Sequence, residues 1–175
     1  MADATIARSA MPAGMGRAEL GRLIALLLPL ALLGGALGSQ YFGGLYPCEM
    51  CWWQRYPHGV AIVLAALAFT APATSRRSRT LTVLAAIAIA ISGAIGFYHA
   101  GVELGVFEGF TTCTTTAKAA TTEELLKQLM KVPLIRCDQV QWSFLGVSLA
   151  GWNAILSLSG AAAILWLTLT GSRVL

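Results

Sequence analysis

The chain has 175 residues, of which 57% are apolar and only 11% are charged. This composition lies far from that of soluble domains and is typical of a membrane protein. The 12 Lys and Arg outnumber the 8 Asp and Glu, but they are gathered in short segments between apolar stretches. The excess positive charge is therefore a signal of membrane orientation, and no nucleic-acid partner is expected.

Four apolar stretches are long enough to cross a bilayer, which takes about 20 residues of helix. Each must be helical, because a spanning segment has to satisfy its own backbone hydrogen bonds. The sequence therefore predicts an all-α membrane protein, a four-transmembrane-helix bundle. The predicted spans are residues 20–39, 56–73, 81–99 and 144–170.

The positive charges predict which ends of these spans face inward. Seven of the 12 cations lie in the N-terminal segment up to Arg22, in the linker at 74–80 or in the tail, and inward-facing segments carry such an excess. We expect residues 1–19 and the tail 171–175 inside, a membrane domain at 20–170, and outer segments at 40–55 and 100–143. The first span has an alternative interpretation as a cleaved signal peptide, because small residues follow its apolar run.

The first outer segment contains the stretch YPCEMCWWQRYPH, residues 46–58. If a helix begins near Pro47, then Cys48, Cys51 and Arg55 fall on one helix face. A helix N-terminus and a guanidinium both favour a thiolate, the form that attacks disulfides. This register favours a functional role for Arg55 over a role as a simple lipid-headgroup anchor.

The second outer segment contains Cys113 and Cys137, separated by the stretch TTEELLKQLMKVP. Thr121 and Glu124 are spaced as a capping box, and Pro133 is a stop signal. One apolar stripe predicts a short interfacial amphipathic helix, although a solvated helix packed on the loop is an alternative.

All four cysteines are thus expected on the outer side. In an oxidising compartment such thiols become disulfides, and Cys48–Cys51 with Cys113–Cys137 is the simplest of three pairings. Alternatives are purely structural disulfides or a zinc site formed by the four cysteines; no metal is predicted. His58 and His99, at the outer ends of spans, could lie among headgroups or bind a polar ligand.

These residues resemble the bacterial disulfide-bond formation protein B family, DsbB. The resemblance rests on PCEMCWWQR, FYHAGVELG, the lone Cys113 and RCDQVQWSFLGVSLAGWN, in that order, and it covers roughly residues 20–170. It implies a bacterial inner-membrane protein with cytoplasmic termini and periplasmic cysteine loops. Such proteins reoxidise a periplasmic DsbA-like thiol oxidase and pass the electrons to the membrane quinone pool.

The resemblance also implies roles for particular residues. Cys113 would form the bond with the partner, and Cys137 would relay to Cys48. Cys51, beside Arg55, would face the quinone, either ubiquinone or menaquinone. His99 and Gln40 match further positions near the quinone.

Two other functions fit some of the same features. One is a vitamin K epoxide reductase-like quinone-linked oxidoreductase, although its Cys-x-x-Cys is expected late in a helical bundle rather than before the second span. The other is a structural zinc-bound membrane protein, which would use the same four cysteines.

Overall fold

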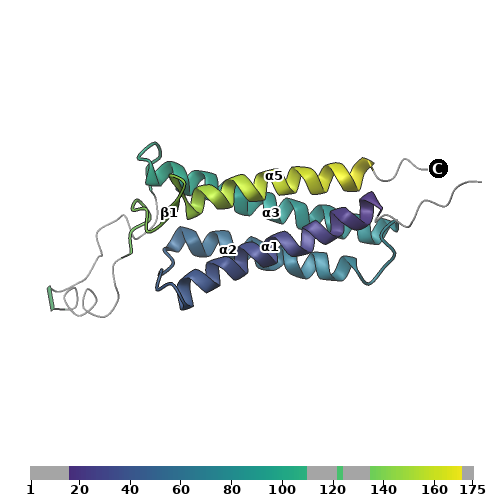
Figure 1. Ribbon diagram of the computed structural model, residues 1–175, viewed down its shortest axis with the longest axis horizontal. Coiled ribbons are helices and arrows are strands. Elements are labelled where there is room, and N and C mark those ends of the chain that lie inside the picture. The colour runs from purple at the N-terminus through teal and green to yellow at the C-terminus, as the bar shows by residue number, and fades with distance from the viewer. Residues whose placement is uncertain (1–15, 110–121, 124–134, 171–175) are drawn as a thin grey trace, which may run out of the picture.

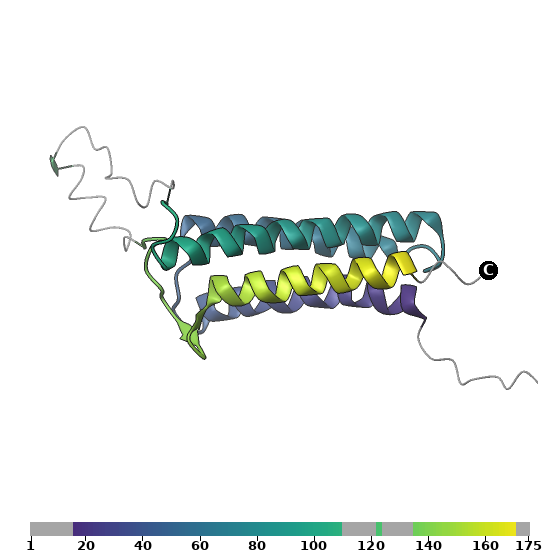
Figure 2. The same ribbon diagram turned by 90° about the horizontal axis from the view of Figure 1, so that it is seen from above.

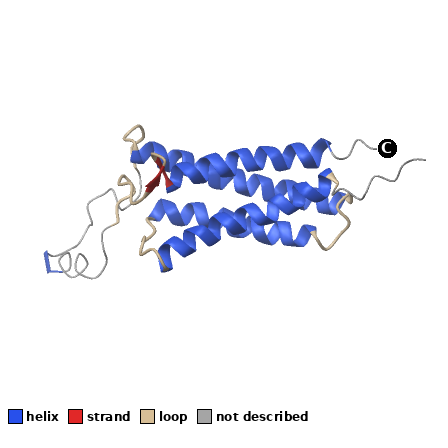
Figure 3. Cartoon of the chain, viewed as in Figure 1, coloured by secondary structure: helices blue, strands red, loops and turns tan. Residues whose placement is uncertain are grey.

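The structure, a computed structural model, describes residues 16–109, 122–123 and 135–170. The described chain is almost entirely helical, with one short hairpin before the last helix (Figure 3). Its elements are α1 (Arg17–Tyr41), α2 (Glu49–Ala68), α3 (Arg76–Glu103), β1 (Ser143–Phe144), β2 (Val147–Ser148) and α5 (Leu149–Thr170).

The four long helices form an up-and-down bundle. Along its perimeter α1 packs on α2, α2 on α3, α3 on α5, and α5 on α1. The start of α1, the connection between α2 and α3 and the end of α5 lie together at one end (Figures 1 and 2). The connection from α1 to α2 and the β1–β2 hairpin lie at the opposite end, which we call the cysteine end because Cys48, Cys51 and Cys137 belong to its segments.

Three of the described helices, α1, α3 and α5, are long and apolar enough to cross a membrane. Helix α2 is not among them, because its first half carries Glu49, Gln54 and Arg55. It nevertheless packs between α1 and α3 as a full member of the bundle. The all-helical membrane fold is therefore confirmed, whereas the count of four spans stays a prediction.

The second predicted span, 56–73, differs from the helix observed. Helix α2 begins at Glu49, after the N-cap residue Cys48, and ends at Ala68. The Cys48 sulfur accepts a hydrogen bond from the backbone N–H of Cys51 at 3.2 Å and so caps the helix. Apolar content alone missed this start, because the first turns of α2 are polar although they are helical.

The fourth predicted span, 144–170, begins too early. Residues 143–148 form an antiparallel hairpin, with Ser143 opposite Ser148 and Phe144 opposite Val147. Its turn residues Leu145 and Gly146 have φ of 53° and 77°, the left-handed conformation that a two-residue hairpin turn requires. Helix α5 therefore starts only at Leu149. The predicted interfacial helix lies almost wholly outside the described residues.

Small side chains let the helices approach closely in the core. The main buried cluster consists mostly of alanines from all four helices, together with Ile89 and Ile164. At Gly93 in α3 an added Cβ would lie 3.0 Å from the Ser157 Cβ in α5, too close for most real contacts. Close packing at small residues is expected between helices in a membrane, where apolar burial alone provides little driving force for association.

Candidate functional site

A cavity of about 600 Å³ opens at the cysteine end of the bundle. Its wall on α1 is mostly apolar and consists of small and aliphatic residues between Ala31 and Ala36, together with Ser39. Polar side chains reach it from the other helices and from the segment before the hairpin. Those that carry the argument are Cys48, Cys51, Gln54, Arg55, His58, His99 and Asn153.

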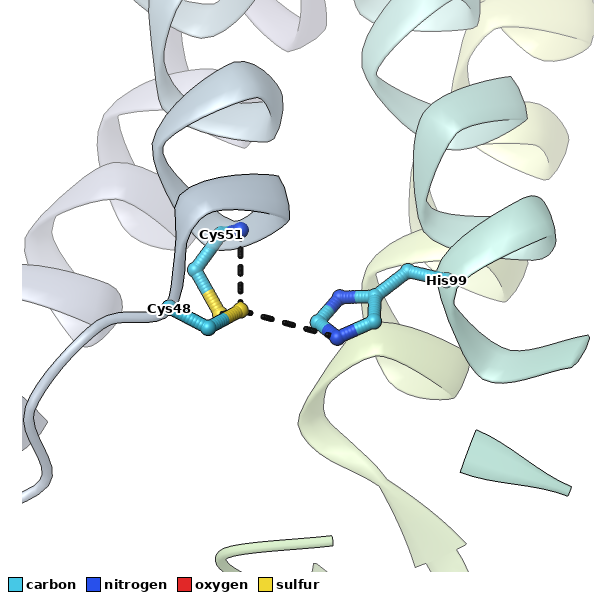
Figure 4. A group of neighbouring side chains, drawn as sticks. All are labelled: Cys48, Cys51 and His99. Carbon is cyan, nitrogen blue, oxygen red and sulfur yellow. Dashed lines mark hydrogen bonds between the residues drawn. The ribbon is translucent and has the colours of Figure 1, made fainter. Parts of the chain in front are cut away.

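The two cysteines of the Cys-x-x-Cys motif lie side by side at the start of α2. Their sulfur atoms are 2.7 Å apart (Figure 4). The two sulfurs are thus close enough to form the predicted Cys48–Cys51 disulfide with little movement of the backbone. Cys48 is buried, whereas Cys51 is partly exposed and lines the cavity.

Cys137 comes from the second outer segment and reaches the same place. It is fully buried and clusters with Cys48, Met50 and Val102. Hydrogen bonding with the Cys137 and Cys51 thiols, followed by burial, raises the pKa of the Cys48 thiol. Three of the four predicted redox cysteines are thus brought together, and Cys113 lies outside the described residues.

His99, near the end of α3, closes this cluster from the opposite side. Its Nε2 atom is 3.6 Å from the Cys48 sulfur (Figure 4) and 3.9 Å from a carboxylate oxygen of Glu103. The backbone of Cys137 also lies close to the ring. The predicted site residue His99 is therefore buried beside the Cys48 thiol.

Arg55 extends from α2 toward α1 beside the cavity. Its guanidinium donates to the Gln40 side-chain oxygen at 2.5 Å and to the Ala36 backbone oxygen at 3.0 Å. It also lies over the ring of Trp52, with 4.9 Å to the centroid. Arg55 is only 9% exposed, so the structure favours a role at the cavity over a role as a headgroup anchor. Gln40, the most weakly indicated residue, orients this arginine.

A buried polar network extends the site deeper into the bundle. Its hydrogen bonds join Gln54 and His58 of α2, Ser92 of α3 and Asn153 of α5. Sequence reasoning considered only His58 among these residues. A signal was available, because uncharged polar side chains such as Gln54 and Asn153 inside apolar helices need partners within the bundle.

Cys48, Cys51 and His99 form the only group of potential metal ligands found among the described residues. Zinc bound tetrahedrally by thiolates at about 2.3 Å separates its sulfur ligands by roughly 3.7 Å. The Cys48 and Cys51 sulfurs, 2.7 Å apart, are closer than that. The arrangement fits a thiol pair that exchanges electrons better than it fits a zinc centre.

The fold and the site together define a class: a helical membrane protein with a Cys-x-x-Cys thiol pair at one end of its bundle. The family model of the disulfide bond formation protein DsbB matches residues 18–167. The chain therefore belongs to the DsbB family, and it is a membrane protein of disulfide bond formation.

Relatives across most of the chain agree with this membership. A disulfide bond formation protein B of Aromatoleum aromaticum is 31% identical over 77% of this chain and 82% of its own. Another, from an Azoarcus species, is 31% identical over 82% of this chain and 87% of its own. An uncharacterised protein of Rickettsia prowazekii is 21% identical over 78% and 79%. No solved structure matches.

Proposed function

We propose that this protein is a protein-dithiol:quinone oxidoreductase of the bacterial inner membrane. It takes two electrons from a reduced, periplasmic DsbA-like thiol oxidase and passes them to a membrane quinone. The observation that carries the proposal is the position of the thiol pair and Arg55 on the wall of one cavity, whose lining from α1 is mostly apolar. An apolar pocket with few convergent polar groups suits a quinone ring.

The first half of the reaction transfers a disulfide from this protein to the reduced partner. A thiolate of the partner attacks Cys113 in the Cys113–Cys137 disulfide, and Cys137 leaves as a thiolate. Cys137 then attacks Cys48 in the Cys48–Cys51 disulfide, and Cys51 leaves as a thiolate. The contact of Cys137 with Cys48 in one buried cluster supports this step. The partner's second thiol attacks the mixed disulfide and releases Cys113, so that the partner departs oxidised.

The second half returns the protein to its oxidised state. Cys113 attacks Cys137 in the Cys48–Cys137 bond, which re-forms Cys113–Cys137 and releases Cys48 as a thiolate. Cys48 and Cys51 then rejoin as a disulfide. A quinone bound in the cavity accepts the two electrons with two protons, and a quinol leaves. Arg55 would donate a charge-assisted hydrogen bond to a quinone oxygen, with Gln40 holding its guanidinium, and would favour the Cys51 thiolate.

The direct test combines the purified protein with a reduced DsbA-like oxidase and a soluble quinone analogue, and follows quinone absorbance. We expect one quinone reduced for each partner disulfide formed, and no reduction with Cys51→Ser. The Cys51→Ser variant controls for direct reaction of the partner with quinone. Partner oxidation without quinone reduction would disprove the proposal. Metal analysis of the same sample tests the zinc alternative, for which about one zinc per chain is required.

A further inference from the structure

In the polar network beneath the thiols, the contacts determine which groups donate and which accept. The assignment begins at a backbone carbonyl. The Asn153 side-chain nitrogen lies 3.2 Å from the backbone oxygen of Ser92. A carbonyl oxygen only accepts, so this atom of Asn153 must be its NH₂ group. The Asn153 oxygen, on its other side, then accepts from the Ser157 hydroxyl and from His58 Nε2, both at 2.9 Å.

The orientation of the Asn153 amide in turn fixes the orientation of the Gln54 amide. The Asn153 NH₂ group donates to the Gln54 side-chain oxygen at 2.8 Å. The Gln54 nitrogen therefore points the other way, where it donates to the Met50 backbone oxygen at 3.1 Å. That oxygen is also an acceptor only, so two independent contacts fix the same orientation of the Gln54 amide.

The second hydrogen of the Gln54 NH₂ group is directed at His99, whose Nδ1 lies 2.9 Å away. A nitrogen that accepts a hydrogen bond carries no proton, so the neutral ring must hold its proton on Nε2. We propose that Gln54 and Asn153 are positioning residues that hold His99 as the Nε2–H tautomer, so that this N–H faces the Cys48 sulfur, 3.6 Å away, with the Glu103 carboxylate next nearest at 3.9 Å.

Burial makes this control effective. Gln54, Ser92 and His99 are all buried, and although Gln54 and His99 also line the cavity, little of either side chain is open to water that could replace a missing partner. An unsatisfied polar group in such a place costs about 1–3 kcal/mol. The alternative tautomer would set an N–H of His99 against the NH₂ group of Gln54 and leave both donors unpaired, which the network therefore excludes.

The consequence for the reaction rests on the function proposed above. Cys48 must leave as a thiolate when Cys113 re-forms its bond with Cys137. A donor N–H beside the sulfur stabilises that negative charge, whereas the other tautomer would present a lone pair to it. His99 in this form can donate from Nε2 to the released Cys48 thiolate and cannot accept a proton from it there. The experiments must therefore measure the tautomer of His99 separately from the activity of the protein.

The first experiment measures the tautomer itself. The chain has only two histidines, so ¹⁵N-histidine NMR of the full-length reduced protein in micelles gives two resolvable rings, assigned with His99→Gln. We expect His99 to be protonated on Nε2 alone. His58 should show the same form, because its Nε2 faces the Asn153 oxygen. A wild-type His99 protonated on Nδ1 would overturn the proposal without any variant.

The second experiment removes the donor. Gln54→Met is close in size but has no amide, so a Nδ1–H fraction of His99 should become detectable while His58 keeps its tautomer. Ser157→Ala is the matched control, because its hydroxyl reaches Asn153 from the side away from Gln54, and His99 should not change in it. An unaltered His99 spectrum in Gln54→Met would show that another group sets the tautomer, and the positioning role would be rejected.

Kinetics then separate this inference from the proposed function. Losing one such hydrogen bond, worth about 0.5–1.5 kcal/mol, should lower kcat for quinone reduction by roughly 2- to 13-fold in Gln54→Met. The KM for quinone should stay the same, because Arg55 is untouched. An unchanged kcat would reject the role in the reaction. If the wild-type protein reduces no quinone yet shows the Nε2–H tautomer, the proposed function fails and the tautomer assignment stands.

Discussion

Arg55 donates a hydrogen bond to the side-chain oxygen of Gln40 at 2.5 Å across the interface between α2 and α1. The bond joins the residue that follows the thiol pair by one turn to the last turn of the preceding helix. It therefore couples the geometry of the cavity to the way α1 and α2 pack. Substitutions of Arg55 and of Gln40 should therefore have related effects on the cavity, which can be measured separately.

The first prediction concerns Arg55. If its guanidinium holds a quinone oxygen, Arg55→Ala loses a charge-assisted hydrogen bond of about 1.5–3 kcal/mol. We expect the KM for quinone to rise roughly 10- to 150-fold, while thiol exchange with the protein partner hardly changes. Arg22→Ala is the control, because Arg22 donates to the Ala71 backbone at the opposite end of the bundle. An unchanged quinone KM would make Arg55 a structural residue.

Gln40 should act through Arg55 and therefore more weakly. Gln40→Leu removes the side-chain acceptor but leaves the bond from Arg55 to Ala36, so the quinone KM should rise by about 2- to 10-fold. Gln40→Glu keeps an acceptor and should restore it. In the Arg55→Ala background Gln40→Leu should have no further effect, because two residues that share one interaction are not additive. Additive effects would mean that Gln40 acts independently.

Gly96 is predicted to be required for the polar network. A Cβ at this position would lie 2.9 Å from the Asn153 nitrogen, 3.0 Å from the Ala150 backbone oxygen and 3.1 Å from the Gln54 oxygen. Gly→Ala in a helix normally stabilises by about 0.5–1 kcal/mol, but overpacking costs about 1–3 kcal/mol. Gly96→Ala should therefore lower Tm in detergent. The control Gly59→Ala, in open space on α2, should keep or raise it.

The bundle and the position of the motif at one end of it could be predicted from the sequence because both follow from local patterns. Apolar length marks α1, α3 and α5, and Cys48, Cys51 and Arg55 share a face by helical periodicity alone. The apolar pattern placed the second span at 56–73, later than the start of α2, since a cysteine that caps a helix leaves no apolar signal. A helix start near Pro47, considered from the position of the proline, agrees with the observed start at Glu49.

The polar network was missed for a different reason. The bonds from Asn153 to Gln54 and from Gln54 to His99 join residues 99 and 45 positions apart. Such partners depend on how three helices pack, which no periodicity within one helix reports. The same holds for Cys137, whose place beside Cys48 was implied only by the family resemblance.

A further prediction concerns membrane orientation. Five of the seven cations assigned to the inner side belong to the described end of the bundle opposite the cysteines, so we expect the cysteine end to face outward. After reduction, a membrane-impermeant maleimide should label cysteines from the outer face of intact spheroplasts. A cysteine-free variant carrying Thr74→Cys, at an exposed position between α2 and α3, should label only in inverted vesicles. The opposite pattern would overturn the orientation and, with it, the access of a periplasmic partner.

The last prediction concerns the order of thiol exchange. An attacking thiolate must reach a sulfur atom, so access decides which cysteine meets the soluble partner. Cys48 is only 3% exposed and Cys137 is fully buried, and Cys51 faces the cavity. Cys113 lies in a polar, threonine-rich stretch, which favours it as the point of contact. We expect a partner that lacks its own resolving cysteine to accumulate as a mixed disulfide at Cys113.

Peptide mapping without reduction locates that bond, and Cys113→Ser should abolish the adduct. Cys137→Ser is the matched control. Cys113 then has no disulfide for the partner to attack, so the adduct should again be absent, although the sulfur that meets the partner is still present. Adding diamide to Cys137→Ser, which oxidises free thiols, should restore a bond between the partner and Cys113. An adduct that maps to Cys48 or Cys51 in the wild-type protein would mean that the partner reaches the buried pair directly, and the relay through Cys137 would be wrong.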